Sequence, residues 1–220
     1  YDNVIHDVAI QDLPVVMCLD RGGLVGEDGV THHGVFDMAA FGAVPGLTIA
    51  APMNEPELRN MMYTALGSGH PFMIRYPRGR GEKFETLPVG RGRRLREGAD
   101  VALLTVGTVG NAAARAAGRA AAEGVSVAHY DLRFVKPLDE ALLDEVGRKF
   151  RRVVTVEDGS LRGGVGEAVA AFFNGRGYDV RGQRLGIGDE WVEHGTPGQL
   201  YALCGYDEEG ILRALLDTRA

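Results

Sequence analysis

Apolar runs and stretches with helical periodicity alternate along the first part of the chain. The helical stretch NEPELRNMMYTAL begins at Asn54, a residue type favoured as an N-cap, and Glu57 completes a capping-box-like start. The apolar runs predict strands at 13–20, 47–52 and 71–77. The first of these runs, LPVVMCLD, lacks polar alternation, so we expect it to be buried on both faces of a parallel sheet.

The first residues of the chain, YDNVIHDVAIQDL, already place apolar side chains at helical spacing. We therefore expect the chain to open inside or at the edge of a helix. The first residue is a tyrosine and no signal-like segment precedes the periodic stretch, so we also expect further protein upstream of it.

The alternation of strands and helices resumes in the second half of the chain. Between the halves, the sequence is rich in glycine and arginine and lacks a long apolar period, as is typical of a linker. Strands are predicted at 100–107, 125–132 and 152–158, with a possible fourth at 183–189. Helices are predicted at 111–124, after Pro137, from about Val165, and at 207–218. The fold class is thus α/β, with two consecutive three-layer α/β domains and mostly parallel sheets, at 1–80 and 100–220, joined by a linker at 81–99.

Composition and charge narrow the classes of function. The chain has 220 residues, 45% of them hydrophobic and 25% charged, which is typical of a soluble globular protein of two domains. No apolar run is long enough for a membrane span. The net charge of -6 argues against a nucleic acid partner. The two cysteines lack metal-binding spacing, so we expect a reducing, cytoplasmic setting.

The stretch from Asp20 to Phe36, DRGGLVGEDGVTHHGVF, combines glycines with ionisable side chains and has no apolar period. It follows the first predicted strand, as RYPRGRG follows the third. Ligands of open parallel sheets bind beyond the carboxyl ends of the strands, so we expect these two loops to share one functional edge. Glycines let the backbone turn and approach a ligand, and we expect Asp28 and His32 to converge on one small molecule. We assign no role to His33.

Three segments of the chain together resemble a known family. These segments, DRGGLVGEDGVTHHGVFD at 20–37, RYPRG at 75–79 and DLRFVKPLDE at 131–140, are similar to motifs of the 1-deoxy-D-xylulose-5-phosphate synthases. That family belongs to the transketolase superfamily of thiamine-diphosphate enzymes. GEDGVTHHG alone is less specific, because other transketolases carry a similar element. The resemblance extends over essentially the whole chain, and it covers most of the family's middle pyrimidine-binding domain and its C-terminal domain.

The resemblance implies an activity for the complete enzyme. The family condenses pyruvate with D-glyceraldehyde 3-phosphate, with decarboxylation, and so feeds isoprenoid, thiamine and pyridoxal synthesis. It implies thiamine diphosphate and Mg²⁺ as cofactors and a homodimer. The family's GDG–asparagine signature and its activating glutamate have no counterpart in this sequence. We therefore expect the metal and cofactor ligands in a missing N-terminal domain, and we expect this polypeptide alone to be inactive.

The resemblance also implies roles for four residues. Arg21 and Arg78 match family residues that bind the phosphate of the aldehyde, a role that suits the paired donors of a guanidinium. His32 matches a histidine near the reactive carbon of the cofactor, where an imidazole can move protons. Asp28 matches a neighbouring acid that holds a substrate hydroxyl or orients the histidine.

Two other interpretations stay open at the level of sequence. The chain could be the β-subunit of a thiamine-dependent 2-oxoacid dehydrogenase, although RYPRG and DLRFVKPLDE argue against it. It could also be a nucleotide-binding module without thiamine, because VALLTVGTVGNAA places glycines after a strand and Asp131 follows at the distance expected of a ribose-binding acid. The segment EDGSLRGGVGEAV is interpreted as a helix entry and dimer contact, with Glu157 structural.

Overall fold

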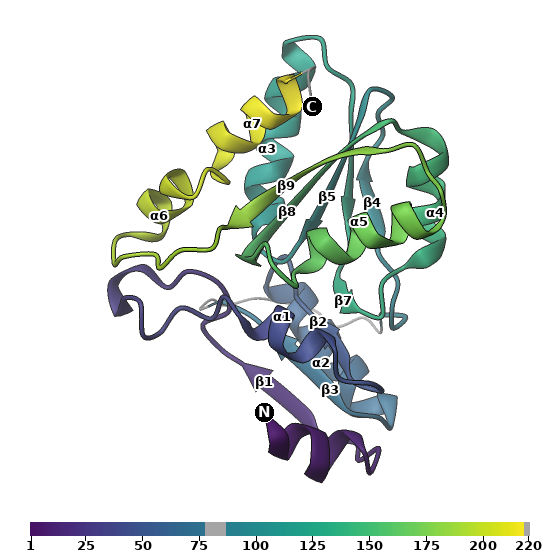
Figure 1. Ribbon diagram of the computed structural model, residues 1–220, viewed down its shortest axis with the longest axis vertical. Coiled ribbons are helices and arrows are strands. Elements are labelled where there is room, and N and C mark those ends of the chain that lie inside the picture. Colours follow the sequence, from purple (N-terminus) through teal and green to yellow (C-terminus); the bar gives the residue numbers. More distant parts are fainter. Residues whose placement is uncertain (78–86, 218–220) are drawn as a thin grey trace.

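The computed structural model describes residues 1–77 and 87–217, which form two α/β units stacked along the long axis of the molecule (Figure 1). Each unit is built on one sheet, with strand order β1-β3-β2-β7 in the first and β4-β6-β5-β8-β9 in the second. Helices cover both faces of each sheet. This confirms the predicted α/β fold class with mostly parallel sheets. None of the helices in the described residues is both long enough and apolar enough to cross a membrane.

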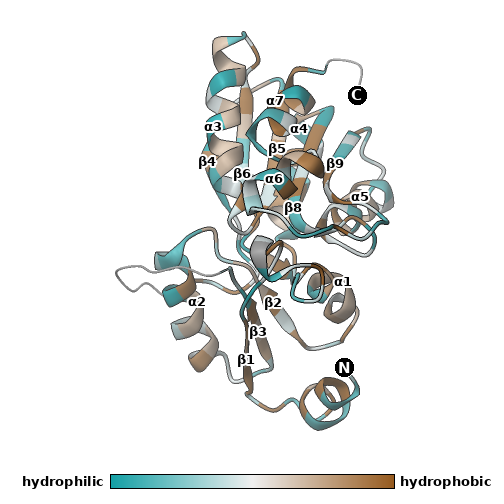
Figure 2. Ribbon diagram, turned by 90° about the vertical axis from the view of Figure 1, so that its left-hand side faces the viewer, coloured by the Kyte–Doolittle hydropathy of each residue, from teal (hydrophilic) through white to brown (hydrophobic). Residues whose placement is uncertain are grey.

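The strands of the first sheet are β1 (Val16–Leu19), β2 (Thr48–Ala50), β3 (Phe72–Arg75) and β7 (Phe134–Lys136). β3 lies between β1 and β2, is parallel to both, and all of its residues are buried. Hydrophobic colouring follows β1 and β3 through this sheet (Figure 2). The first strand was predicted to be buried on both faces, and this is wrong, because β1 is an edge strand on which Cys18 is exposed.

The first sheet lies between α2 (Glu55–Ser68) on one face and, on the other, α1 (Asp37–Gly42) and the opening helical turn η1 (Val4–Ala9). Phe72 of β3 packs in one cluster with Met61 of α2, whereas Met73 points to the opposite face and joins a cluster with Met38 of α1. This alternation is the ordinary side-chain geometry of a strand.

The strands of the second sheet are β4 (Arg93–Arg96), β5 (Val101–Val106), β6 (Val127–Asp131), β8 (Arg152–Ser160) and β9 (Arg181–Ile187). β5 is central and wholly buried. Its side chains alternate between two cores: Leu103 packs on the side of the C-terminal helix, and Leu104 packs on the side that also contains Met73 of the first sheet. One apolar core is therefore continuous from the first unit into the second.

The helices on one face of the second sheet are α3 (Val109–Ala122), α6 (Pro197–Leu203) and α7 (Glu208–Leu216), and those on the other face are α4 (Glu140–Lys149) and α5 (Val165–Gly175). Most were predicted from periodicity. α6 and α1 were not, because each spans fewer than two turns of a helix and shows too little of the period.

Two short strands depart from the domain division expected from the sequence. β4 lies inside the expected linker and pairs antiparallel with β6. Its sequence, RRLR, has no apolar alternation that could predict a strand. β7 comes from the second half of the chain but completes the first sheet, antiparallel to β2. The first sheet therefore includes a strand from the second half of the chain, and the two units also share an apolar core.

A buried cluster of charged side chains joins α2 of the first unit to β4 and β6 of the second. Glu57 Oε1 accepts from Arg133 Nε at 2.8 Å and forms an ion pair with Arg93 Nη2 at 2.8 Å. Arg93 also lies 3.1 Å from Asp131 Oδ2, and burial together with Glu57 raises the pKa of Asp131. Removing one member of such a cluster leaves a buried charge unpaired, so the cluster fixes how the units dock.

His129 of β6 provides a pH-dependent test of this core. It is buried with Nε2 2.9 Å from Thr105 Oγ1, and burial, reinforced by Arg93 and Arg96, lowers the pKa of His129 to about 4. The folded chain thus holds the imidazole neutral, so the stability this group contributes is complete above its unfolded pKa of 6.5 and is lost as pH falls toward 4. Between these values the wild type should lose about 3 kcal/mol of unfolding free energy that His129→Gln keeps.

Urea titrations of the chain across this pH range measure that difference. His6→Gln is the matched control, since His6 is exposed and should lose stability in parallel with the wild type. A gap between wild type and His129→Gln that does not change with pH would show that the buried imidazole is not held neutral.

Candidate functional site

The glycine-rich loop at 20–36 is closed at its base and anchored to the end of β3. Gly23 and Gly34 exchange two backbone hydrogen bonds, of 2.8 and 2.9 Å, and Gly22 N donates to Tyr76 O at 3.0 Å. β1 and β3 are parallel neighbours, so the segments that follow them leave the sheet at the same edge. The two loops were predicted to share one edge; the loop at 20–36 and the first residues after β3, Tyr76 and Pro77, do so, and the rest of the second loop lies outside the described residues.

Arg21 and Asp28 meet across this loop. Arg21 Nε donates to Asp28 Oδ2 at 3.1 Å, and Arg21 Nη1 donates to Asp20 Oδ2 at 2.7 Å. These carboxylates, Asp28 first, raise the pKa of the Arg21 guanidinium. Arg21 has φ +57°, in the left-handed region that a side chain rarely adopts. A half-exposed arginine is thus held in a defined orientation, with Nη2 free of partners among the described residues.

The two adjacent histidines of the loop have different surroundings. His32 is exposed, and its Nδ1 lies 2.9 Å from Thr31 Oγ1. His33 is half-buried, and its Nδ1 accepts from Val25 N at 3.3 Å. Among the described residues no hydrogen bond joins Asp28 to His32, so in this state Asp28 orients Arg21 and not the histidine.

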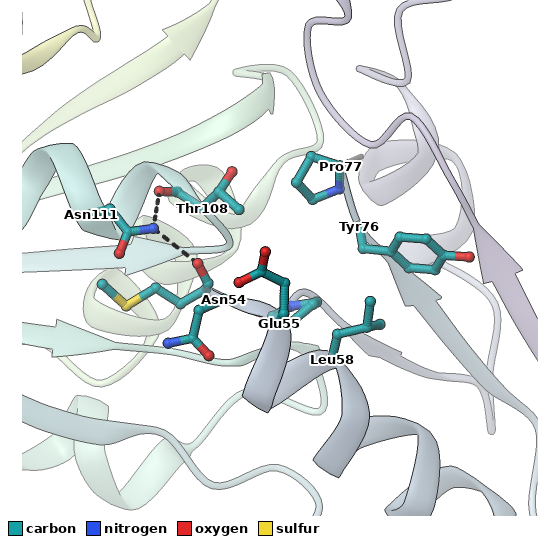
Figure 3. Close-up of a pocket in the computed structure, with 9 residues that line it drawn as sticks. Asn54, Glu55, Leu58, Tyr76, Pro77, Thr108 and Asn111 are labelled. Atoms are coloured by element: carbon teal, nitrogen blue, oxygen red, sulfur yellow. Dashed lines mark hydrogen bonds between the residues drawn. The ribbon is translucent and has the colours of Figure 1, made fainter. Parts of the chain in front are cut away.

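Arg78, the other predicted phosphate ligand, lies outside the described residues. The segment leading to it borders a cavity of about 340 Å³ between the two units, lined by Tyr76, Pro77, Asn54, Glu55, Leu58 and neighbouring residues (Figure 3). Across this cavity the Asn111 amide donates to Met53 O at 3.0 Å and to Thr108 O at 3.1 Å. The cavity therefore lies where the carboxyl ends of β2 and β3 face the start of α3, as expected of a ligand site in open sheets.

The two sequence features that suggested a nucleotide site near α3 have structural roles. A side-chain atom on Gly110 would lie 3.0 Å from the Met53 sulfur, so this glycine gives close packing between the units. Asp131, the candidate ribose ligand, is fully buried and bonded to Arg93 and to Arg133 N. Both features that suggested a nucleotide-binding module are used in joining the two units.

Ligands for a metal are not gathered in the part of the chain that the structure describes. Those residues include no group of three or more His, Cys, Asp or Glu side chains that could hold a metal ion. Glu157 instead caps a helix, because its carboxylate accepts from Val165 N at 2.8 Å and Gly166 N at 2.9 Å. This is the structural role that the sequence predicted for Glu157.

The glycine-rich loop at 20–36 lies at the junction of two α/β units, with hydrogen bonds to both. Residues 1–83 match the transketolase pyrimidine binding domain, and residues 90–211 match the transketolase C-terminal domain. The chain belongs to the transketolase family. This confirms the resemblance inferred from the three sequence motifs.

Two curated relatives are similar to this chain over all or nearly all of its length. The 1-deoxy-D-xylulose-5-phosphate synthase of Bacteroides fragilis is 58% identical and covers 100% of this chain, and that of Bacteroides thetaiotaomicron is 57% identical and covers 98%. The chain spans 35% of the length of each of these relatives. A solved structure described as "Split gene transketolase, inactive beta4 tetramer" matches 97% of this chain and 69% of its own, with a TM-score of 0.84 and 27% identity.

Sequence reasoning missed two residues that hold the loop, Arg75 and Asp158. Arg75 belongs to the RYPRG motif but is buried, and its Nε donates to Asp37 Oδ2 at 2.7 Å. Asp158 belongs to a second EDG sequence, at the end of β8, and accepts from Leu24 N at 3.1 Å. The available signal was an acid directly at the end of a buried strand, where polar groups reach a shared edge.

The histidine environments predict effects of different size on stability for two adjacent substitutions. His33→Ala leaves the part-buried Val25 N–H without its acceptor and should cost about 1 kcal/mol of unfolding free energy. His32→Ala removes only exposed contacts and should stay within about 0.5 kcal/mol of wild type. Chemical denaturation of the three chains measures both, and a larger loss for His32→Ala would reverse the assignment.

Proposed function

We propose that the complete protein condenses pyruvate with D-glyceraldehyde 3-phosphate, with loss of carbon dioxide, to form 1-deoxy-D-xylulose 5-phosphate. The observation that carries the proposal is the 58% identity, across the whole of this chain, to a relative named for that synthase. The paired Arg21 and Asp28 support it, because an oriented guanidinium suits a phosphorylated substrate. Isoprenoid, thiamine and pyridoxal synthesis would consume the product.

The two matched regions would supply only part of the site. We assign residues 1–80 to the pyrimidine-binding domain and 100–220 to the C-terminal domain, with 81–99 as the connection, from which β4 joins the second sheet. Thiamine diphosphate, when bound, supplies the carbon nucleophile of this reaction class. The described residues offer no metal site for Mg²⁺ and the diphosphate, so we place those ligands in the part of the relatives that this chain does not span.

The residues of this chain would handle the substrates. Arg21, with Arg78 from the neighbouring loop, binds the phosphate of the aldehyde, and Asp28 keeps the Arg21 guanidinium facing it. His32, exposed on the same loop, takes up or delivers a proton as the new carbon–carbon bond forms. Its hydrogen bond with Thr31 sets the orientation of the ring.

Assembly is part of the proposal. The similar split-gene chain is described as an inactive tetramer of β chains, which supports the expectation that this polypeptide alone has no activity. The complete enzyme would be a cytoplasmic homodimer.

Substrate dependence tests the reaction. Complete enzyme with thiamine diphosphate and Mg²⁺ should consume pyruvate and release carbon dioxide in proportion to the glyceraldehyde 3-phosphate supplied, and the chain at 1–220 alone should do neither. Coupled detection of carbon dioxide and of the phosphorylated product measures this. Turnover that requires an oxidised lipoyl acceptor would instead favour a 2-oxoacid dehydrogenase.

Loss of the His32 imidazole should slow the chemistry. His32→Ala in the complete enzyme should lower kcat by about 100-fold, the usual scale for a lost general acid or base. His70→Ala is the matched control, because His70 is also exposed but bonds to Asp12, outside the substrate loop. Steady-state kinetics decides the point, and equal rates for the two variants would remove His32 from proton transfer.

A further inference from the structure

The substrate loop belongs to the first unit but is held at both ends by the end of β8 in the second. Near its start, Leu24 N donates to Asp158 Oδ1 at 3.1 Å. At its end, Val35 O accepts from Ser160 N at 2.9 Å. Both ends of the loop therefore rest on three consecutive residues of one strand, 158–160.

The Asp158 carboxylate is fixed from within its own unit. Tyr206 Oη donates to Oδ1 at 2.7 Å, and Tyr201 Oη donates to Oδ2 at 3.1 Å. The residue is 3% exposed, and burial raises the pKa of Asp158 against the opposing effect of Arg75. A carboxylate buried in this way is oriented by its donors, so it offers the loop an acceptor at a defined position.

Arg75 of β3 links the loop, α1 and β8. Its Nη2 donates to Gly34 O at 2.8 Å and to Asp158 O at 3.0 Å, while Nε bonds to Asp37 of α1. Gly34 is the residue that closes the loop on Gly23. The closing pair of the loop is thus bonded, through one guanidinium, to the backbone of Asp158.

The loop backbone also fits closely against the carboxylate. Gly23 has φ +87°, and a side-chain atom there would overlap the Asp158 carboxyl group. Only glycine combines this backbone conformation with this approach. Gly23 and Leu24 lie two and three residues after Arg21 in the sequence, so the position of the carboxylate sets the path of the chain that carries the guanidinium.

We propose that Asp158 is a positioning residue for phosphate recognition: by holding Gly23 and Leu24 it places the Arg21 guanidinium for a phosphorylated aldehyde. This rests on the proposed function. The C-terminal unit thereby contributes to substrate selection without touching the substrate. A displacement of the loop base by about 1 Å would misalign the donors of Arg21, and misplacements of about this size greatly lower the rates of reactions that depend on oriented groups.

Hydrogen exchange on the chain at 1–220 tests the anchoring independently of any activity. Asp158→Ala should accelerate exchange at Leu24 and at the Gly23–Gly34 pair by about 10-fold or more. Asp158→Asn, which retains an acceptor of the same shape, should restore most of the protection. Glu157→Ala is the matched control, because it removes an equally buried acid of the same strand whose bonds go to α5 and not to the loop.

Substrate selectivity of the complete enzyme tests the positioning itself. The readout is the ratio of kcat/KM for glyceraldehyde 3-phosphate to that for unphosphorylated glyceraldehyde, in which the fraction of active enzyme cancels. Asp158→Ala should lower this ratio by about 10-fold, Asp158→Asn by much less, and Glu157→Ala should leave it unchanged. Gly23→Ala, which pushes the loop off the same carboxylate while the second unit stays intact, should lower it as Asp158→Ala does and serves if that variant does not fold.

Arg21→Ala distinguishes the positioning role of Asp158 from phosphate recognition by the loop. If it lowers the ratio and neither Asp158→Ala nor Gly23→Ala does, the positioning role of Asp158 is overturned and the proposed function stands. If Arg21→Ala also leaves the ratio unchanged, phosphate recognition by this loop is wrong, and the exchange data alone then report the anchoring. Equal loop exchange in Asp158→Ala and wild type would overturn the anchoring itself.

Discussion

The structure depends on how two oppositely charged, buried side chains are satisfied where the units meet. Arg75 comes from β3 and Asp158 from β8, and each is at least nine-tenths buried. An unpaired charge at such a depth is strongly unfavourable, so each must find partners from every element nearby. Arg75 finds Asp37, Gly34 O and Asp158 O, and Asp158 finds two tyrosines and a backbone amide. Both residues also bond to the glycine-rich loop, which is thereby held between the two units.

The apolar core reinforces the same arrangement. One cluster of buried side chains runs from Met73 of the first sheet to Leu104 of the second, and β7 gives the first sheet a strand from the second half of the chain. The cluster around Glu57 adds a second set of ion pairs across the junction. Since burial is non-directional, the apolar core supplies the attraction, whereas the charged clusters fix the orientation. The loop between the units is bonded to both of them, so its geometry is fixed by how they pack together.

The sequence predicts the fold well and the site only in part, for a physical reason. Buried strands and amphipathic helices depend on local periodicity, so their order could be read from the chain, whereas RRLR of β4 carries no period and was assigned to a linker. The loop was found from its composition. The bond between Arg21 and Asp28 was not, because side chains seven apart in an irregular loop have no fixed spatial relation. Arg75 reads as a loop-end arginine, and only the tertiary structure shows that it is buried.

The two adjacent acids of β8 show how one local sequence serves both sides of the sheet. Successive side chains of a strand point to opposite faces. Glu157 therefore reaches the side of α5 and caps that helix, while Asp158 reaches the side of α6 and α7, where it accepts from Tyr201 of α6 and from Tyr206 between the two helices. The glycine that follows leaves room for Met38 of α1, which a side chain on Gly159 would overlap. The second EDG sequence thus connects the two units through three consecutive residues of one strand. Glu157 caps α5, Asp158 binds the glycine-rich loop, and Gly159 leaves space for Met38 of α1.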